Sequence, residues 1–168
     1  MTGTEPIVVV DYGMGNVGSI LNMLRKVGAR AEASRSVETI GQAARLILPG
    51  AGAFDAGMQS IEERGLRQVL DEKALVEKVP VLGICLGAQL MTSSSEEGNR
   101  AGLGWIPGRT VRFSGDAGLK VPHMGWNRVA AWRDSPLTAA LPAELRYYFV
   151  HSYYIRAEHE QAVILKTP

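Results

Sequence analysis

Three short runs of β-branched and aliphatic residues, each ending at a glycine-containing turn, most strongly constrain the fold of this chain. They are PIVVVDYG (6–13), RLILPGAG (45–52) and VPVLGIC (79–85). Unbroken apolar runs of this length are typical of strands buried on both faces of a parallel sheet. Because segments with helical periodicity separate the runs, we predict βαβ units with right-handed crossovers.

The sequence pattern changes after Ser93. A polar, glycine-rich stretch is followed by four strand-like runs, TVRF, KVPHMGWNRVAAW, LRYYFVHSYYIRA and AVILKT. Turns rather than helices separate them, which favours antiparallel pairing. The prediction is therefore an α/β fold of three α/β/α layers, with a central mostly parallel sheet and an antiparallel C-terminal extension. At 168 residues the chain, 1–168, is expected to form a single domain.

Charge and composition exclude several function classes. The formal net charge is +1 and no run of Lys or Arg exceeds two, so we expect no nucleic acid and no anionic membrane as a partner. The apolar runs are too short to span a bilayer. A single cysteine excludes an internal disulfide and suits a reducing compartment, so we expect a cytoplasmic protein.

That cysteine, Cys85, occupies a strand–turn–helix sequence, GICLG (83–87). The form is that of a nucleophile elbow with Cys in place of Ser, in which the two glycines allow a strand and a helix to approach closely. The amide of Leu86 and the helix N-terminus would favour a thiolate and an oxyanion. The alternative is a buried cysteine that acts as a small hydrophobic residue.

Two neighbouring features support a catalytic interpretation. Gly50, Ala51 and Gly52 form a glycine-rich loop that could turn a backbone N–H toward an oxyanion, although it could also be an ordinary β–α turn. Gln89 follows Cys85 by four residues and so lies on the same helix face. It could pair with an amide-bearing substrate or be a solvated helix residue.

Together, LPGAG, GICLGAQL and SEEG resemble the class I, triad-type glutamine amidotransferases. DYGMGN (11–16), PHMGWN (122–127) and YYFVHSYY (147–154) narrow the resemblance to the glutaminase subunits of imidazole glycerol phosphate synthase. The resemblance covers nearly the whole chain. It implies hydrolysis of glutamine to glutamate and ammonia, passage of the ammonia to a (β/α)8 synthase partner in a heterodimer, and a role in histidine biosynthesis.

The resemblance also implies roles for individual residues. Cys85 is the nucleophile, and Gly50, Ala51, Gly52 and Leu86 form the oxyanion site. The residues implied to hold glutamine are Gln89, Glu97, His151, Ser152 and Tyr153, with Glu97 facing the α-ammonium group. The residues implied to meet the synthase are Asn16, Trp126, Asn127 and Tyr148. Simpler structural interpretations remain open. Trp126 and Tyr148 could be ordinary core or interface aromatics, and Glu97 could be a solvated loop acid.

None of the three histidines is assigned the role of general base or of metal ligand. The resemblance places His151 in the glutamine-binding segment, and three scattered histidines with one cysteine make zinc improbable, so we expect no metal and no cofactor. The family pattern carries its base and orienting acid in a His-Pro-Glu stretch that does not occur in these residues. We therefore expect a fragment that lacks the C-terminal strands and the His and Glu of the triad, and that is inactive alone.

Two other functions remain open. The chain could be a related glutaminase that supplies ammonia for amidation of a bacterial surface sugar. It could instead be a non-catalytic glutaminase-like subunit that keeps the partner interface, if the chain ends at Pro168.

Overall fold

A four-stranded parallel sheet forms the centre of the N-terminal part, as the apolar runs predicted. The computed structural model describes residues 5–115, 120–142 and 144–167. The strand order is β2-β1-β3-β4. The strands are β1 (Ile7–Val10), β2 (Ala31–Ser34), β3 (Leu46–Leu48) and β4 (Val81–Gly83). β3 lies between β1 and β4, with Leu48 in register with Gly83.

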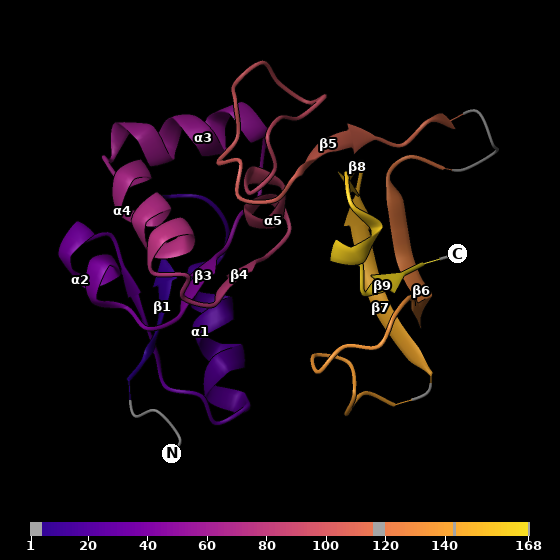
Figure 1. The fold of residues 1–168 in the computed structure, drawn as a ribbon, viewed down its shortest axis with the longest axis horizontal. Coiled ribbons are helices and arrows are strands. Elements are labelled where there is room, and N and C mark those ends of the chain that lie inside the picture. Colours follow the sequence, from indigo (N-terminus) through magenta and orange to yellow (C-terminus); the bar gives the residue numbers. More distant parts are fainter. Residues whose placement is uncertain (1–4, 116–119, 143, 168) are drawn as a thin grey trace.

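Helices cover this sheet (Figure 1). They are α1 (Val17–Lys26), α2 (Val37–Gln42), α3 (Phe54–Glu63), α4 (Arg67–Asp71), one π-helical turn η1 (Glu72–Val76) and α5 (Leu86–Leu90). Asn16 is the N-cap of α1, and its side chain accepts a hydrogen bond from the Ser19 amide at 3.0 Å. Such a cap satisfies one of the amides that the first turn leaves without a partner. None of the described helices is long and apolar enough to cross a membrane.

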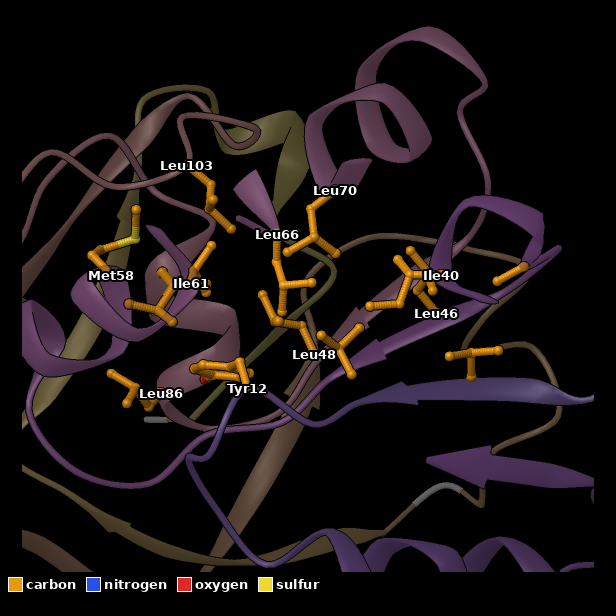
Figure 2. Packing of buried hydrophobic residues seen from close by; sticks show 14 of the residues in the cluster. Tyr12, Ile40, Leu46, Leu48, Met58, Ile61, Leu66, Leu70, Leu86 and Leu103 are labelled. Carbon is orange, nitrogen blue, oxygen red and sulfur yellow. The ribbon is translucent and has the colours of Figure 1, made fainter. Parts of the chain in front are cut away.

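The core lies between one face of the sheet and α2–α5 (Figure 2). Its large members are fully buried and come from strands, helices and the loop after β1: Tyr12, Ile40, Leu48, Phe54, Met58, Ile61, Leu70, Leu86 and Leu90. Burial of apolar area at roughly 25 cal/mol per Å2 is the main force that holds these layers together. Leu86 and Leu90 belong to α5, so the core also fixes the helix that follows Cys85.

The second half is antiparallel, as predicted, and forms two small sheets beside the parallel one. β5 (Gly108–Arg112) pairs with β8 (Tyr153–Ala157). The other sheet has the order β7-β6-β9, with β6 (His123–Ala131), β7 (Leu145–His151) and β9 (Leu165–Lys166). A 3-10 turn, η3 (Glu160–Ala162), precedes β9. Figure 1 shows these strands flanking the α/β layers.

Backbone hydrogen bonds connect the two halves at α5 and the segment that follows it. The Thr110 amide donates to the Ser94 carbonyl at 2.8 Å, and the Glu96 amide donates to the Thr110 carbonyl at 2.9 Å. The side chain of Gln89 reaches the Tyr153 carbonyl at 3.3 Å. These contacts place β8 and the end of β7 beside the turn that carries Cys85.

Candidate active site

Cys85 lies in a strained turn between β4 and α5. Its φ of 53° and ψ of −118° are rare for a residue with a side chain, and the thiol is exposed. Strain of this kind persists only where the surroundings impose it, and it is concentrated at functional sites. The turn has the geometry that GICLG predicted, and the exposed thiol does not fit the alternative of a buried hydrophobic cysteine.

The glycines on either side make this geometry possible. A Cβ on Gly83 would lie 2.5 Å from Ala88 Cα, and one on Gly87 would lie 1.8 Å from the Leu48 carbonyl oxygen. No side chain fits in either space, so strand and helix can approach closely only because both positions are glycine.

One amide beside the thiol is available to an oxyanion. The amides of Gly87, Ala88 and Gln89 donate to carbonyls of Ile84 and Cys85. Within the described part of the chain, the Leu86 amide donates to no carbonyl. It begins the helix next to the nucleophile, where a donor to a tetrahedral intermediate is needed.

The candidate oxyanion loop, Gly50–Gly52, packs directly against this turn. A Cβ on Gly50 would lie 2.7 Å from the Gly87 amide nitrogen and 2.8 Å from Leu86 Cβ. Gly52 has a φ of 117°, which strongly favours glycine. The Ala51 side chain is exposed. The loop and the Cys85 turn therefore form one unit at the carboxyl ends of β3 and β4, where open parallel sheets bind ligands.

Tyr12 holds this loop in place through a buried hydrogen bond. The sequence patterns did not single this residue out. Its side chain is fully buried, and its hydroxyl donates to the Pro49 carbonyl at 2.5 Å. The pKa of Tyr12 lies well above its ordinary value. Burial is the larger cause and the nearby charge of Cys85 the smaller one, so the phenol stays a donor. Its place directly before the first glycine turn was the only sequence signal.

A groove of about 350 Å3 lies above the thiol. It brings together Cys85 and Gln89 with residues from the end of β7 and from β8. The residues that line it are Cys85, Ala88, Gln89, Tyr148, Phe149, Val150, His151, Tyr153, Tyr154 and Ile155. The predicted nucleophile Cys85 and three residues predicted to hold glutamine, Gln89, His151 and Tyr153, therefore share one groove, together with Tyr148, which was predicted to meet the partner. Ser152 does not line it, and its carbonyl accepts from the Phe113 amide at 3.1 Å.

His151 lies in this groove with both ring nitrogens occupied. Its Nδ1 is 2.8 Å from the Tyr153 carbonyl oxygen, and its Nε2 is 3.0 Å from His123 Nδ1. His123 Nε2 is in turn 3.3 Å from Asn127 Nδ2. This pattern is satisfied when both rings are neutral and each carries its proton on Nδ1. His151 thus holds the backbone of the groove and is not arranged as a base for Cys85.

Glu97 has a structural partner. Its Oε2 accepts a hydrogen bond from the Phe54 amide at the start of α3, at 2.8 Å. Nearby, the Asp55 carboxylate accepts from the amides of Asn99 and Arg100, and these hydrogen bonds lower the pKa of Asp55. The carboxylate of Glu97 is thus held by a helix N-terminus and is not among the groove residues. Contact with a substrate ammonium group remains a prediction.

The residues predicted to contact a partner do not all lie on one face of the structure. Trp126 and Tyr148 are paired across β6 and β7, and their rings are 5.8 Å apart between centroids in an edge-to-face arrangement. Both are largely exposed, at 65% and 56%, which excludes the plain-core interpretation. Asn127 bonds to His123 and lies on the opposite face of β6, while Asn16 caps α1. Within the described residues, no three His, Cys, Asp or Glu groups could hold a metal ion.

Comparison with known proteins defines the class to which this fold and site correspond. The family described as "Glutamine amidotransferase class-I" matches residues 8–167, and the chain belongs to it. A crystal structure of a glutamine amidotransferase is similar in fold, with a TM-score of 0.69, 18% identity, and 91% of this chain and 75% of that one covered. A glutamine amidotransferase from Thermotoga maritima gives a TM-score of 0.61 at 16% identity, covering 92% and 64%.

Curated relatives place the chain more narrowly, among the HisH subunits of imidazole glycerol phosphate synthase. HisH 2 of Pseudomonas aeruginosa is 50% identical over 159 residues, 95% of this chain and 79% of that protein. HisH 2 of Methanococcus maripaludis is 48% identical, covering 96% and 80%. HisH of Leptospira interrogans is 40% identical, covering 94% and 79%. The resemblance stated from the sequence motifs is thereby confirmed.

Proposed function

We propose that this chain is the glutaminase subunit of an imidazole glycerol phosphate synthase in histidine biosynthesis. The observation that carries the proposal is the exposed Cys85 thiol in a strained turn, in one groove with Gln89 and the β7–β8 segment. The HisH relatives support the choice of pathway. The proposed partner is a (β/α)8 synthase subunit that receives the ammonia.

The proposed chemistry begins with attack of Cys85 Sγ on the side-chain amide carbon of glutamine. The carbonyl oxygen becomes an oxyanion, to which the Leu86 amide and the Gly50–Gly52 loop would donate. The C–N bond then breaks, ammonia leaves with the proton taken from the thiol, and a thioester remains. Water hydrolyses the thioester to glutamate and restores the thiol.

The proton carrier in this scheme is a histidine oriented by a glutamate, and both remain predictions. His123 and His151 are poor candidates because all four of their ring nitrogens have partners. Without a base, thiol activation and protonation of the leaving ammonia would be slow by roughly two to four orders of magnitude. Binding of glutamine does not need the base.

An electrophilic glutamine analogue tests the site without requiring turnover. We expect a chloroketone analogue of glutamine to alkylate Cys85 and an excess of glutamine to slow the labelling. Modification is read by mass spectrometry, with Cys85→Ser as the negative control. Labelling that glutamine does not slow would contradict a glutamine site. It would favour the non-catalytic alternative.

The synthase complex tests the role of the thiol in the reaction. In a complex whose glutaminase subunit also carries the histidine and glutamate, Cys85→Ala should abolish synthesis from glutamine while synthesis from free ammonium continues at the wild-type rate. This separation is expected because ammonium bypasses the thiol. Full glutamine-dependent synthesis by Cys85→Ala would refute the assignment of the nucleophile.

A second candidate is a related glutaminase that serves another acceptor, such as a surface sugar. Two relatives, at 50% and 48% identity, are both numbered HisH 2, and numbered copies are consistent with a division of roles. Complementation distinguishes the candidates. The test uses a subunit that carries the histidine and glutamate as well as these residues. Its ability to restore growth of a histidine auxotroph that lacks its own glutaminase subunit would favour histidine biosynthesis, and failure to grow despite measurable glutaminase activity would favour the second acceptor.

A further inference from the structure

The candidate oxyanion loop is anchored at both ends by side chains from distant parts of the sequence. Just before the loop, the Pro49 carbonyl accepts from the Tyr12 hydroxyl, which lies 37 residues away in sequence. Just after it, the Phe54 amide donates to Glu97 Oε2 at 2.8 Å, across 43 residues. The first hydrogen bond is buried and the second half-buried, so both are stronger than they would be in water. The loop is therefore a short span with two fixed ends.

Between these anchors the backbone amides are free. In the described part of the chain, the amides of residues 50–53 donate to no acceptor. A peptide unit is planar, and its carbonyl and amide point in opposite directions. Because Tyr12 fixes the Pro49 carbonyl, it also fixes the direction of the Gly50 amide. A Cβ on Gly50 would lie 2.7 Å from the Tyr12 hydroxyl oxygen, so the loop rests directly on this side chain.

Helix α3 holds both anchoring residues. The Tyr12 carbonyl accepts from Arg64 Nε, just after the end of α3, at 3.0 Å. In the first turn of α3, the Asp55 carboxylate accepts from the amides of residues 99–100, which fixes the turn that follows Glu97. One helix therefore sets the positions of both anchors, and through them the span of the loop.

Resting on the proposed function, we propose that Tyr12 and Glu97 are positioning residues that hold the oxyanion loop for the reaction. They fix its two ends so that its free amides face the oxyanion formed when Cys85 attacks. Glu97 uses only Oε2 for this, and among the described residues its Oε1 makes no hydrogen bond and stays free for a substrate ammonium group. Donors that are fixed before the reaction need no reorganisation as charge develops. The anchors should therefore raise turnover and not affinity for glutamine.

The test uses a synthase complex whose glutaminase subunit also carries the histidine and glutamate, and it measures kcat and KM for glutamine. Tyr12→Phe keeps the ring and removes the first anchor, so kcat should fall about tenfold while KM stays within about twofold. Glu97→Ala removes the second anchor and should lower kcat by a similar factor. Glu97→Gln keeps an oxygen that can accept from the Phe54 amide, so its kcat should stay within about twofold of the wild type.

A matched core variant separates anchoring from stability. Ile40 is fully buried on α2, which packs against α4 and β1 and not against the loop. Ile40→Val should lower the thermal midpoint, because it removes a buried methyl group, and should leave kcat unchanged. Synthesis from free ammonium bypasses the loop, so it measures the amount of assembled complex in each variant.

Wild-type kcat in either Tyr12→Phe or Glu97→Ala would overturn the proposal and leave the proposed function intact. A higher KM at unchanged kcat in Tyr12→Phe would contradict it as well, since the residue would then act on binding. A tenfold fall of kcat in Ile40→Val or in Glu97→Gln would assign the effect to lost stability or lost charge, and the anchoring role would be wrong. No synthesis from glutamine by the unmodified complex would refute the proposed function together with this proposal.

Discussion

At the scale of single residues, Tyr12 shows how a buried hydroxyl fixes the backbone beside a nucleophile. The loop after β1 packs against the candidate oxyanion loop, since a Cβ on Gly15 would lie 3.2 Å from Gly50 Cα and one on Gly52 would lie 2.9 Å from Met14 Cε. The Tyr12 hydroxyl adds a hydrogen bond to the Pro49 carbonyl. Because the Pro49 carbonyl is buried, water cannot replace the Tyr12 hydroxyl as its hydrogen-bond donor.

Tyr12→Phe should therefore destabilise the chain. The ring remains in the core but the Pro49 carbonyl loses its partner, which costs about 1–3 kcal/mol in the free energy of unfolding. Urea unfolding measures the change. Tyr154→Phe is the control, because the Tyr154 hydroxyl accepts only from the exposed Arg156 and its loss should cost within about 0.5 kcal/mol. Equal losses for the two variants would contradict a structural role for the Tyr12 hydroxyl.

At the scale of elements, the His123–His151 pair joins β6 to β7 and both to the groove. The two residues are directly in register, and Phe149 and Phe113 pack around the rings. The pKa of His123 lies below its ordinary value. Burial is the larger cause and the neighbouring His151 the smaller one. Protonation of His123 would make its Nε2 a donor that faces the Asn127 Nδ2 donor, which this chain of hydrogen bonds does not accommodate.

The pair should therefore make the fold sensitive to acid. A histidine with a lowered pKa in the folded state binds fewer protons than in the unfolded chain, so stability falls as pH drops below about 6.5 and the loss levels off below the folded pKa. His123→Phe should reduce the difference in urea midpoint between pH 7.5 and pH 5.5. His159→Phe, at an exposed position after β8, should not. An unchanged pH dependence in His123→Phe would contradict a contribution of His123 to the acid sensitivity.

At the scale of the whole molecule, the groove depends on two halves that Gln89 joins. Gln89 lies on α5 and Tyr153 begins β8, and their hydrogen bond spans 64 residues of sequence. A ligand that contacts both halves binds only when they are correctly placed, so it stabilises the folded molecule as a whole.

Glutamine should therefore raise the thermal midpoint of the chain. At ten times its dissociation constant the expected gain is about 1.4 kcal/mol. Gln89→Ala should abolish most of this shift, since it removes both the contact with Tyr153 and a groove side chain. Gln59→Ala, which loses only a contact with Glu63 on the surface of α3, is the control and should keep the full shift. A full shift in Gln89→Ala would exclude Gln89 from the binding site.

The local elements could be predicted from the sequence because their causes are local. The apolar runs indicated β1, β3 and β4, and Gly83 and Gly87 indicated the turn at Cys85. Each of these signals depends on residues within about one helical turn of the element that it specifies. The motifs likewise indicated the family, which the comparisons confirmed.

Only the tertiary structure decided which distant residues meet. Strand register placed His123 beside His151 and Arg128 opposite Arg146, and the alternation of side chains along β6 separated Asn127 from Trp126. The Phe54 amide at the start of α3 became the partner of Glu97. The sequence determined what each segment forms and which chemistry Cys85 can perform. Register and packing, which depend on every element at once, decided what surrounds that thiol and which face is left for a partner.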